Sequence, residues 1–139
     1  MCYNAFRTIR FIRFVLNVSF QQLEVLAFPG HSKGSLTFIE KRDDIVFVGD
    51  SILFRILIDR GHIAEYIRSL DRFMEKTEGI GQIIKGHQTD LFARKDAFDL
   101  RECAIDIISG KAQGKPYELL GGWWMLYQRG KMRIAVTDG

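Results

Sequence analysis

The alternation of apolar and polar positions becomes regular from residue 23 onward. β-Branched and aromatic runs predict strands at residues 23–28, 35–40 and 44–50. Pro29-Gly30 ends the first run with residues that favour a turn. The charged segment Lys41-Arg42-Asp43 separates the second run from the third, which is typical of a hairpin. This part of the chain therefore predicts three successive strands.

The hydrophobic period then changes from that of a strand to that of a helix. Residues 62–79 carry six apolar side chains at helical spacing, and these are Ile63, Tyr66, Ile67, Leu70, Phe73 and Met74. Gly79 supplies a C-terminal stop. A second helix is predicted over residues 95–109, with Gly110 at its end. Cys103 lies on the apolar stripe of this helix, which predicts a small buried core residue.

Further strand signals come before and after the second helix. Residues 81–87, "GQIIKGH", predict a short strand, and the runs at 123–127 and 132–136 predict a terminal hairpin. We interpret the Trp123-Trp124 pair as sheet packing rather than as a binding platform. The order of strands and helices predicts a layered arrangement of the α/β class.

Charge and length narrow the classes of protein that fit. The 139 residues suffice for one domain, and the net charge is +3. Arg7, Arg10 and Arg13 precede the first acid, Glu24, so the basic excess is confined to the N-terminal end and a nucleic-acid partner is not expected. We divide the chain into an atypical basic segment, residues 1–19, and a domain, residues 20–139. We interpret the first segment as an untidy N-terminus that was not selected to start a domain. A transit peptide or a basic surface helix stays open as an alternative, because its arginines share a helical face.

The sequence pattern indicates neither a membrane span nor a secretory signal. The sequence has no apolar run of about 18 residues, so no membrane span is expected. It also begins without a clean apolar stretch and a small-residue cleavage site, which argues against a secretory signal. We therefore expect a cytoplasmic protein.

Three potential metal ligands share one sequence context. His31, Asp50 and His87 each follow a glycine, and each comes just after an apolar strand. Glycine permits a tight turn, so the next side chain is able to point over the edge of the sheet. Imidazole and carboxylate groups suit zinc, with iron or manganese as substitutes. The repeated pattern predicts that the three side chains converge at one sheet edge.

Each of these residues also has a simpler interpretation when it is considered alone. A single loop histidine is ordinarily solvent-exposed, and a single aspartate after glycine is ordinarily a turn residue or helix cap. His62 keeps this interpretation, because it opens a helix and follows no strand end. The joint pattern favours the metal-ligand role for His31, Asp50 and His87.

These three segments resemble a known family of metal-dependent enzymes. "PGHSKGS", "VFVGD" and "IIKGH" are similar, in order and spacing, to the third, fourth and fifth conserved motifs of the metallo-β-lactamase superfamily. The resemblance implies that residues 20–139 are the C-terminal half of an αββα sandwich, with a mixed sheet, two helices on one of its faces and a terminal hairpin. It implies that His31 binds a first zinc ion, that Asp50 bridges two zinc ions, and that His87 binds the second.

The aspartate at the bridging position is similar to that of the glyoxalase II and lactonase branches. That similarity implies small-molecule substrates with an ester, thioester or lactone group. Phe54 and Arg55 occupy a segment that borders the substrate cleft in such enzymes, although we interpret both as ordinary loop residues.

The sequence departs from the family in its first half. The family's H-x-H-x-D-H motif is absent, and the chain has only three histidines. More than half of the implied ligands are therefore missing, so we expect weak zinc binding and no appreciable hydrolysis by this chain alone. The strands "LTFI" and "IVFV" are apolar on both sides, so an exposed apolar sheet face and self-association are expected as well.

Two functional interpretations stay open. In the first, the chain is part of a truncated or split zinc-dependent hydrolase, and a partner chain supplies the missing half. In the second, it is a non-catalytic interaction module or pairing subunit derived from the same fold.

Overall fold

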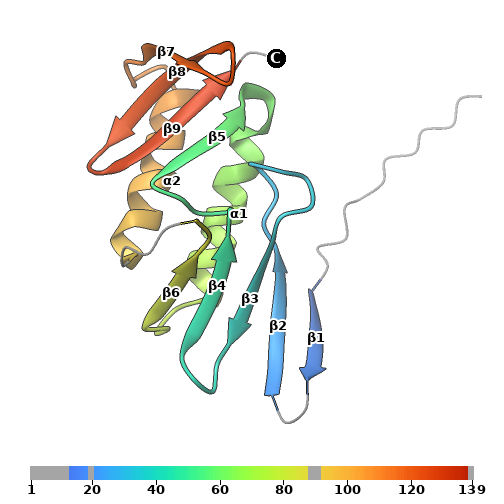
Figure 1. Ribbon diagram of the computed structural model, residues 1–139. Coiled ribbons are helices and arrows are strands. Elements are labelled where there is room, and N and C mark those ends of the chain that lie inside the picture. The colour runs from blue at the N-terminus through green and yellow to red at the C-terminus, as the bar shows by residue number, and fades with distance from the viewer. Residues whose placement is uncertain (1–12, 19–20, 88–91, 138–139) are drawn as a thin grey trace, which may run out of the picture.

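The computed structural model describes residues 13–18, 21–87 and 92–137 of the chain. Its strands and helices, in chain order, are β1 (Arg13–Val18), β2 (Gln21–Ala27), β3 (Leu36–Glu40), β4 (Ile45–Gly49), β5 (Arg55–Asp59), the 3-10 turn η1 (Arg60–His62), α1 (Ile63–Lys76), β6 (Gln82–Lys85), α2 (Arg94–Ile108), β7 (Lys115–Leu119), β8 (Gly122–Arg129) and β9 (Met132–Thr137). The strands form sheet A, in the order β1-β2-β3-β4-β6, and sheet B, in the order β5-β9-β8-β7 (Figure 1).

Sheet A brings three strand ends together. β2, β3 and β4 pair in antiparallel fashion, and β4 pairs with β6 in parallel. β2, β4 and β6 therefore run in the same direction, and their C-terminal ends lie at one end of the sheet (Figure 1). The loops that follow these three strands carry the candidate ligands.

Sheet B begins directly after one of those loops. Residues 50–54 lead from the end of β4 to β5, which pairs in parallel with β9 near the other end of the chain. β8 pairs in antiparallel fashion with both β9 and β7. The segment after Asp50 therefore connects the two sheets.

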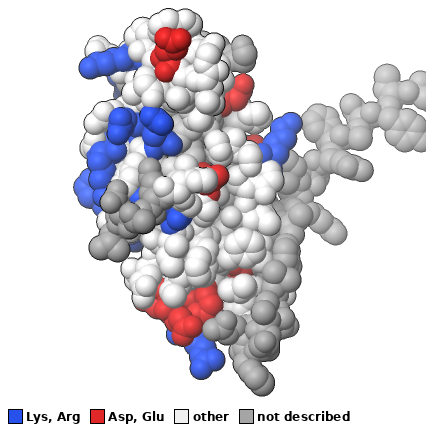
Figure 2. Space-filling model, in the orientation of Figure 1, with Lys and Arg blue, Asp and Glu red and all other residues white. Residues whose placement is uncertain are grey.

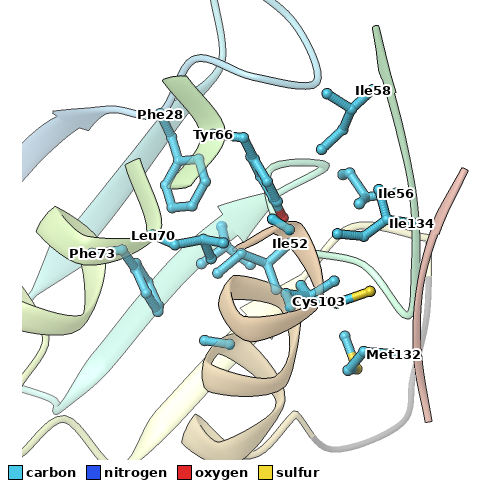
Figure 3. Close-up of a cluster of buried hydrophobic side chains, with 14 of the residues drawn as sticks. Phe28, Ile52, Ile56, Ile58, Tyr66, Leu70, Phe73, Cys103, Met132 and Ile134 are labelled. Atoms are coloured by element: carbon cyan, nitrogen blue, oxygen red, sulfur yellow. The ribbon is translucent and has the colours of Figure 1, made fainter. Parts of the chain in front are cut away.

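One apolar core joins both sheets to both helices. Sheet A contributes Ile39 and Val46, sheet B contributes Ile56 and Ile134, and α1 contributes Leu70 to the same buried cluster (Figure 3). α1 and α2 also pack against each other. Both sheets turn one face toward the same two helices, so the helices lie on one side of the sheets. The α/β class with two helices on one face is therefore confirmed.

The face of sheet A opposite the helices carries an apolar row. Val25, Phe38, Phe47 and Ile84 lie directly across from one another on β2, β3, β4 and β6. Phe47 is 40% exposed and Ile84 is 43% exposed. The expected exposed apolar face is confirmed at β4 and β6, whereas Val25 on β2 is fully buried. We call this face the open face of sheet A.

Charged side chains gather elsewhere on the molecule. Figure 2 shows acidic side chains at the end of the molecule that holds the β3–β4 turn, where Asp43 and Asp44 are exposed. Basic side chains gather on the side of α2 and the β8–β9 hairpin (Figure 2). Within the described residues, no helix is both long and apolar enough to cross a membrane.

The structure corrects the predicted elements in three places. The strands β1, β5 and β7 were not predicted, and the strands divide between two sheets rather than forming one. β7 contains Pro116, which argues against a central strand, and the structure places β7 at the edge of sheet B, where proline is tolerated. The interpretation of Arg55 as a loop residue was wrong. It begins β5, and its guanidinium donates a hydrogen bond to the Tyr117 hydroxyl at 2.6 Å.

The tryptophan pair also differs in part from its prediction. Trp123 is 72% exposed, so the packing interpretation was wrong for this residue. It lies opposite Glu118 of the edge strand β7, close to the β7–β8 turn. Trp124 is half-buried, and its indole N–H donates to the Leu119 carbonyl at 3.2 Å. The prediction for Cys103 was confirmed, because this residue is only 3% exposed.

Candidate functional site

The three predicted ligands all follow strands that end at the same end of sheet A. His31 lies in the turn after β2, Asp50 comes directly after the last residue of β4, and His87 lies two residues beyond β6. This placement follows from the shared direction of β2, β4 and β6. The pattern of a strand, a glycine and a ligand thus delivers three metal-compatible side chains to one region.

Asp50 and His87 are in direct contact. Nε2 of His87 lies 3.2 Å from Oδ1 of Asp50, and both side chains are substantially exposed. The backbone N–H of Gly86 donates to the carbonyl of Gly49 at 2.9 Å, just past the last paired residues of β4 and β6. This hydrogen bond prolongs the parallel pairing, and it brings the residues that follow the two glycines together.

Glycine is required at Gly86 for reasons of space. A Cβ atom there would lie 2.6 Å from Oδ1 of Asp50 and 3.3 Å from the carbonyl carbon of Gly49. Two neighbouring residues have backbone angles in the left-handed region. Gly49, the last residue of β4, has φ +52°, and His87 has φ +57°. The left-handed region is uncommon for a residue with a side chain, although histidine enters it more often than most. The backbone at this point therefore holds the aspartate and the histidine against each other.

His31 is oriented by the backbone of β5. Its Nδ1 lies 2.8 Å from the carbonyl oxygen of Leu57. A carbonyl oxygen only accepts hydrogen bonds, so Nδ1 carries the proton, and Nε2 holds the lone pair when the ring is neutral. A histidine that binds a metal through one ring nitrogen commonly donates from the other in this way. The bond therefore leaves Nε2 of His31 as the nitrogen that suits a metal.

The three side chains do not form a complete metal site. Within residues 13–18, 21–87 and 92–137, no group of three or more His, Cys, Asp or Glu side chains is arranged to hold a metal ion. The structure brings together Asp50 and His87, and His31 does not join them in a group of three. His62 lies in η1, and its Nδ1 is 4.0 Å from Oδ1 of Asp59 in the same turn. The metal roles of His31, Asp50 and His87 stay predictions.

A buried lysine supports the two loops that carry Asp50 and His87. Lys85 is 7% exposed, and its Nζ lies 3.2 Å from the ring centroid of Phe54. Nζ of Lys131 lies 4.9 Å from the same ring, so Phe54 has a cation–π contact with each ammonium group. Sequence reasoning missed this cluster. The signal was present, because Lys85 and the half-buried Ile83 share one face of β6 while the exposed Ile84 lies on the other.

Comparison with solved structures identifies the fold. A metallo-beta-lactamase family protein from Thermus thermophilus superposes with a TM-score of 0.58 and 22% identity, over 70% of this chain and 35% of that chain. The metallo-beta-lactamase from Pontibacter korlensis gives a TM-score of 0.54 and 11% identity, over 68% of this chain and 46% of its own. The chain has part of the metallo-β-lactamase fold. The resemblance noted in the sequence is thereby confirmed for the fold.

Curated proteins with similar sequences match the chain over only part of their length. The acyl-coenzyme A thioesterase MBLAC2 of Bos taurus and that of Homo sapiens are each 32% identical to the chain over 78 residues. The protein of the same name from Gallus gallus is 30% identical. Each alignment covers 52% of this chain and 28% of the relative. No protein-family model matches the chain. The chain therefore matches less than a third of the length of these relatives.

Proposed function

We propose that residues 20–139 contribute part of a zinc-dependent hydrolase site of the metallo-β-lactamase type. In this proposal Asp50 and His87 are ligands of one zinc ion, Asp50 also reaches a second ion, and His31 is a ligand of that second ion. The contact between the Asp50 carboxylate and the His87 imidazole, 3.2 Å apart at the ends of two parallel strands, is the main support. A carboxylate and an imidazole are both ordinary zinc donors.

The three loops supply the donors from defined backbone positions. Asp50 offers carboxylate oxygens and His87 offers Nε2, while His31 is held through Nδ1 with Nε2 left for a metal. When bound, zinc lowers the pKa of a coordinated water and supplies hydroxide at neutral pH. The chain's own part is to hold these donors and to keep the His31 ring in one tautomer.

The donor set of these 139 residues is too small for catalysis without further ligands. Asp50 and His87 provide two protein donors, whereas a catalytic zinc generally has three. The remaining donors would come from an H-x-H-x-D-H segment, which this sequence does not contain. We therefore expect the 139-residue chain to bind zinc weakly and to show no appreciable hydrolysis by itself.

The substrate class in this proposal is a small molecule with a thioester, ester or lactone group. The thioesterase name of the MBLAC2 relatives supports a thioester as the first substrate to test. A complementing polypeptide that carries H-x-H-x-D-H would have to be present for any turnover to appear.

The zinc affinities of variants at Asp50 and His87, compared with that of a control variant, test the proposal. Asp50→Asn and His87→Ala should each lower the affinity at least about tenfold, because each removes one of the few donors. His62→Ala is the control, since His62 also lies beside an aspartate but belongs to η1 rather than to one of the three loops. Equal affinities for all three variants and the unmodified chain would contradict the proposal. Two tightly held zinc ions with thioester turnover by the unmodified chain would contradict the expected incompleteness.

The open face of sheet A favours a second candidate function, that of a non-catalytic pairing subunit. The exposed part of the row, Phe47 and Ile84 with the half-buried Phe38 beside them, would be buried by a partner chain or a second copy. The two candidates differ in what each variant changes. Under the second, Asp50→Asn leaves association unchanged, whereas a polar residue at Phe47 weakens it.

A further inference from the structure

One buried residue of α1 contacts two of the ligand-bearing loops. The hydroxyl of Tyr66 donates to the carbonyl of Ser51 at 3.0 Å, and Ser51 is the residue after Asp50. The ring of Tyr66 packs against Gly30, the residue before His31. A Cβ at Gly30 would lie 2.5 Å from Cδ2 of Tyr66, so nothing larger than glycine fits.

A second buried residue of α1 strengthens the contact with the turn that holds Gly30 and His31. The Ser69 hydroxyl donates to the carbonyl of Pro29 at 2.8 Å, and Ser69 is fully buried. Residues three apart on a helix lie on the same face, so Tyr66 and Ser69 meet the turn together. The ring of Phe28, 5.8 Å from that of Tyr66 between centroids, packs at the end of β2 (Figure 3). The His31 turn therefore rests on α1 from residue 28 to residue 30.

We propose that Tyr66 is a positioning residue that fixes the His31 turn and the Asp50 segment relative to each other. The inference rests on the proposed function, because it treats His31 and Asp50 as ligands. Metal sites need their ligands held within about 0.5 Å of the binding geometry. Tyr66 is suited to this task because it is fully buried and bridges the two loops with one rigid side chain.

The hydroxyl of Tyr66 keeps its proton over the working range of pH. Burial raises the pKa of this phenol well above its ordinary value. The O–H therefore remains a donor to Ser51 in neutral and moderately alkaline solution, and the bridge does not switch with pH.

Two substitutions separate the two contacts. Tyr66→Phe removes only the hydroxyl and leaves the ring on Gly30, whereas Tyr66→Leu removes both contacts. Phe73→Leu is the matched control, because Phe73 is another buried aromatic residue of α1 whose ring packs on Phe28 at 5.8 Å between centroids. Each variant is compared with the unmodified 139-residue chain.

Amide hydrogen exchange of the metal-free chain gives the first measurement. Tyr66→Phe should speed exchange in residues 49–54 and leave residues 28–35 and β9 unchanged, while Tyr66→Leu should speed exchange in both loops. Phe73→Leu should change residues 49–54 no more than it changes β9, which reports global opening. It serves as the control for residues 49–54 alone, because Phe28, on which its ring packs, belongs to the range 28–35. Unchanged exchange at residues 49–54 in Tyr66→Phe, or an equal rise in β9, would overturn the proposal. Tyr66→Phe decides alone if Tyr66→Leu does not fold.

Zinc affinity gives the second measurement. Tyr66→Phe should lower it by about tenfold, as loss of an outer contact of a metal site commonly does. Unchanged affinity in this variant would overturn the role of Tyr66 in placing ligands. If the unmodified chain binds no zinc, the proposed function fails. Hydrogen exchange then still decides whether Tyr66 couples the two loops.

Discussion

Nε2 of His87 lies 3.2 Å from Oδ1 of Asp50, although the two residues are 87 − 50 = 37 positions apart in the chain. Their contact is produced by the backbone, because Gly86 donates to Gly49 and continues the pairing of β4 with β6 beyond the strands. This pairing places the side chains of Asp50 and His87, which follow the two glycines, next to each other. The candidate site thus depends on a close approach of two chain segments as much as on the ligands.

Substitution of Gly86 tests this dependence. Gly86→Ala would place a Cβ 2.6 Å from Oδ1 of Asp50, so the carboxylate has to move away. Because the Asp50 side chain is 46% exposed and is able to turn toward solvent, we expect the free energy of unfolding to fall by about 0.5 kcal/mol or less. Zinc affinity should fall as well, because Asp50 and His87 no longer meet. Urea unfolding and zinc titration measure the two effects.

Gly34→Ala provides the control for that experiment. A Cβ at Gly34 would have no neighbour within 4 Å, and this residue is not among those with positive φ. Alanine at a compatible position stabilises a protein by about 0.4–1 kcal/mol through the unfolded state. If Gly86→Ala proves as harmless as Gly34→Ala, the close approach does not constrain Asp50.

The open face of sheet A supports a separate prediction about association. Phe47→Thr combined with Ile84→Thr removes the two most exposed members of the apolar row while keeping β-branched residues that suit a strand. We expect a lower apparent mass in light scattering at tens of micromolar, and weaker binding of an apolar dye, because the exposed apolar patch shrinks.

A control variant shows whether position or mere exposure matters. Phe98 is 49% exposed on α2, outside the open face, so Phe98→Ala removes one side chain whose exposed fraction is similar to that of Phe47 or Ile84. It should leave the apparent mass unchanged. A monomeric unmodified chain without dye binding would show that the open face drives no association under these conditions.

The helices were predictable from the sequence because their apolar residues are local. Ile63, Tyr66, Leu70 and Phe73 repeat at helical spacing, and all four are fully buried in the structure. β5 was missed for the opposite reason. Its sequence, RILID, has only three apolar residues between charged ones, and its partner β9 lies more than 70 residues further along. Pairing over such a distance leaves no local pattern.

The candidate site, too, was only partly predictable from the sequence. The repeated glycine before His31, Asp50 and His87 located the three loops, and the Asp50–His87 contact agrees with that pattern. The hydrogen bond from His31 to the Leu57 carbonyl could not be predicted from the sequence, because every residue has a backbone carbonyl and the acceptor is therefore not marked by its residue type. Tyr66 appeared only as one member of an apolar stripe. Its contacts with Gly30 and Ser51 required the packed structure.

Cys103 predicts how stability depends on pH. Burial, with a smaller contribution from the Asp106 carboxylate, raises the thiol pKa from 9.0 to about 11, against an opposing effect of Arg129. Below pH 9 the thiol is protonated in both the folded and the unfolded chain, so it adds no pH dependence. Between pH 9 and about 11 only the unfolded chain loses this proton, which favours unfolding. The contribution of Cys103 to stability is therefore complete at neutral pH and declines as the solution becomes more alkaline.

Urea unfolding of the unmodified chain and of Cys103→Ala at pH 7, 8, 9, 10 and 10.5 checks this prediction. The variant should be less stable at neutral pH, because alanine leaves a small cavity in the core. Its free energy of unfolding should then fall less between pH 9 and 10.5 than that of the unmodified chain, because the titrating thiol is gone. Tyr66 is present in both proteins, so its ionisation at higher pH in the unfolded state affects both equally. Parallel curves for the two proteins across this range would mean that the Cys103 thiol ionises as readily in the folded chain as in the unfolded one.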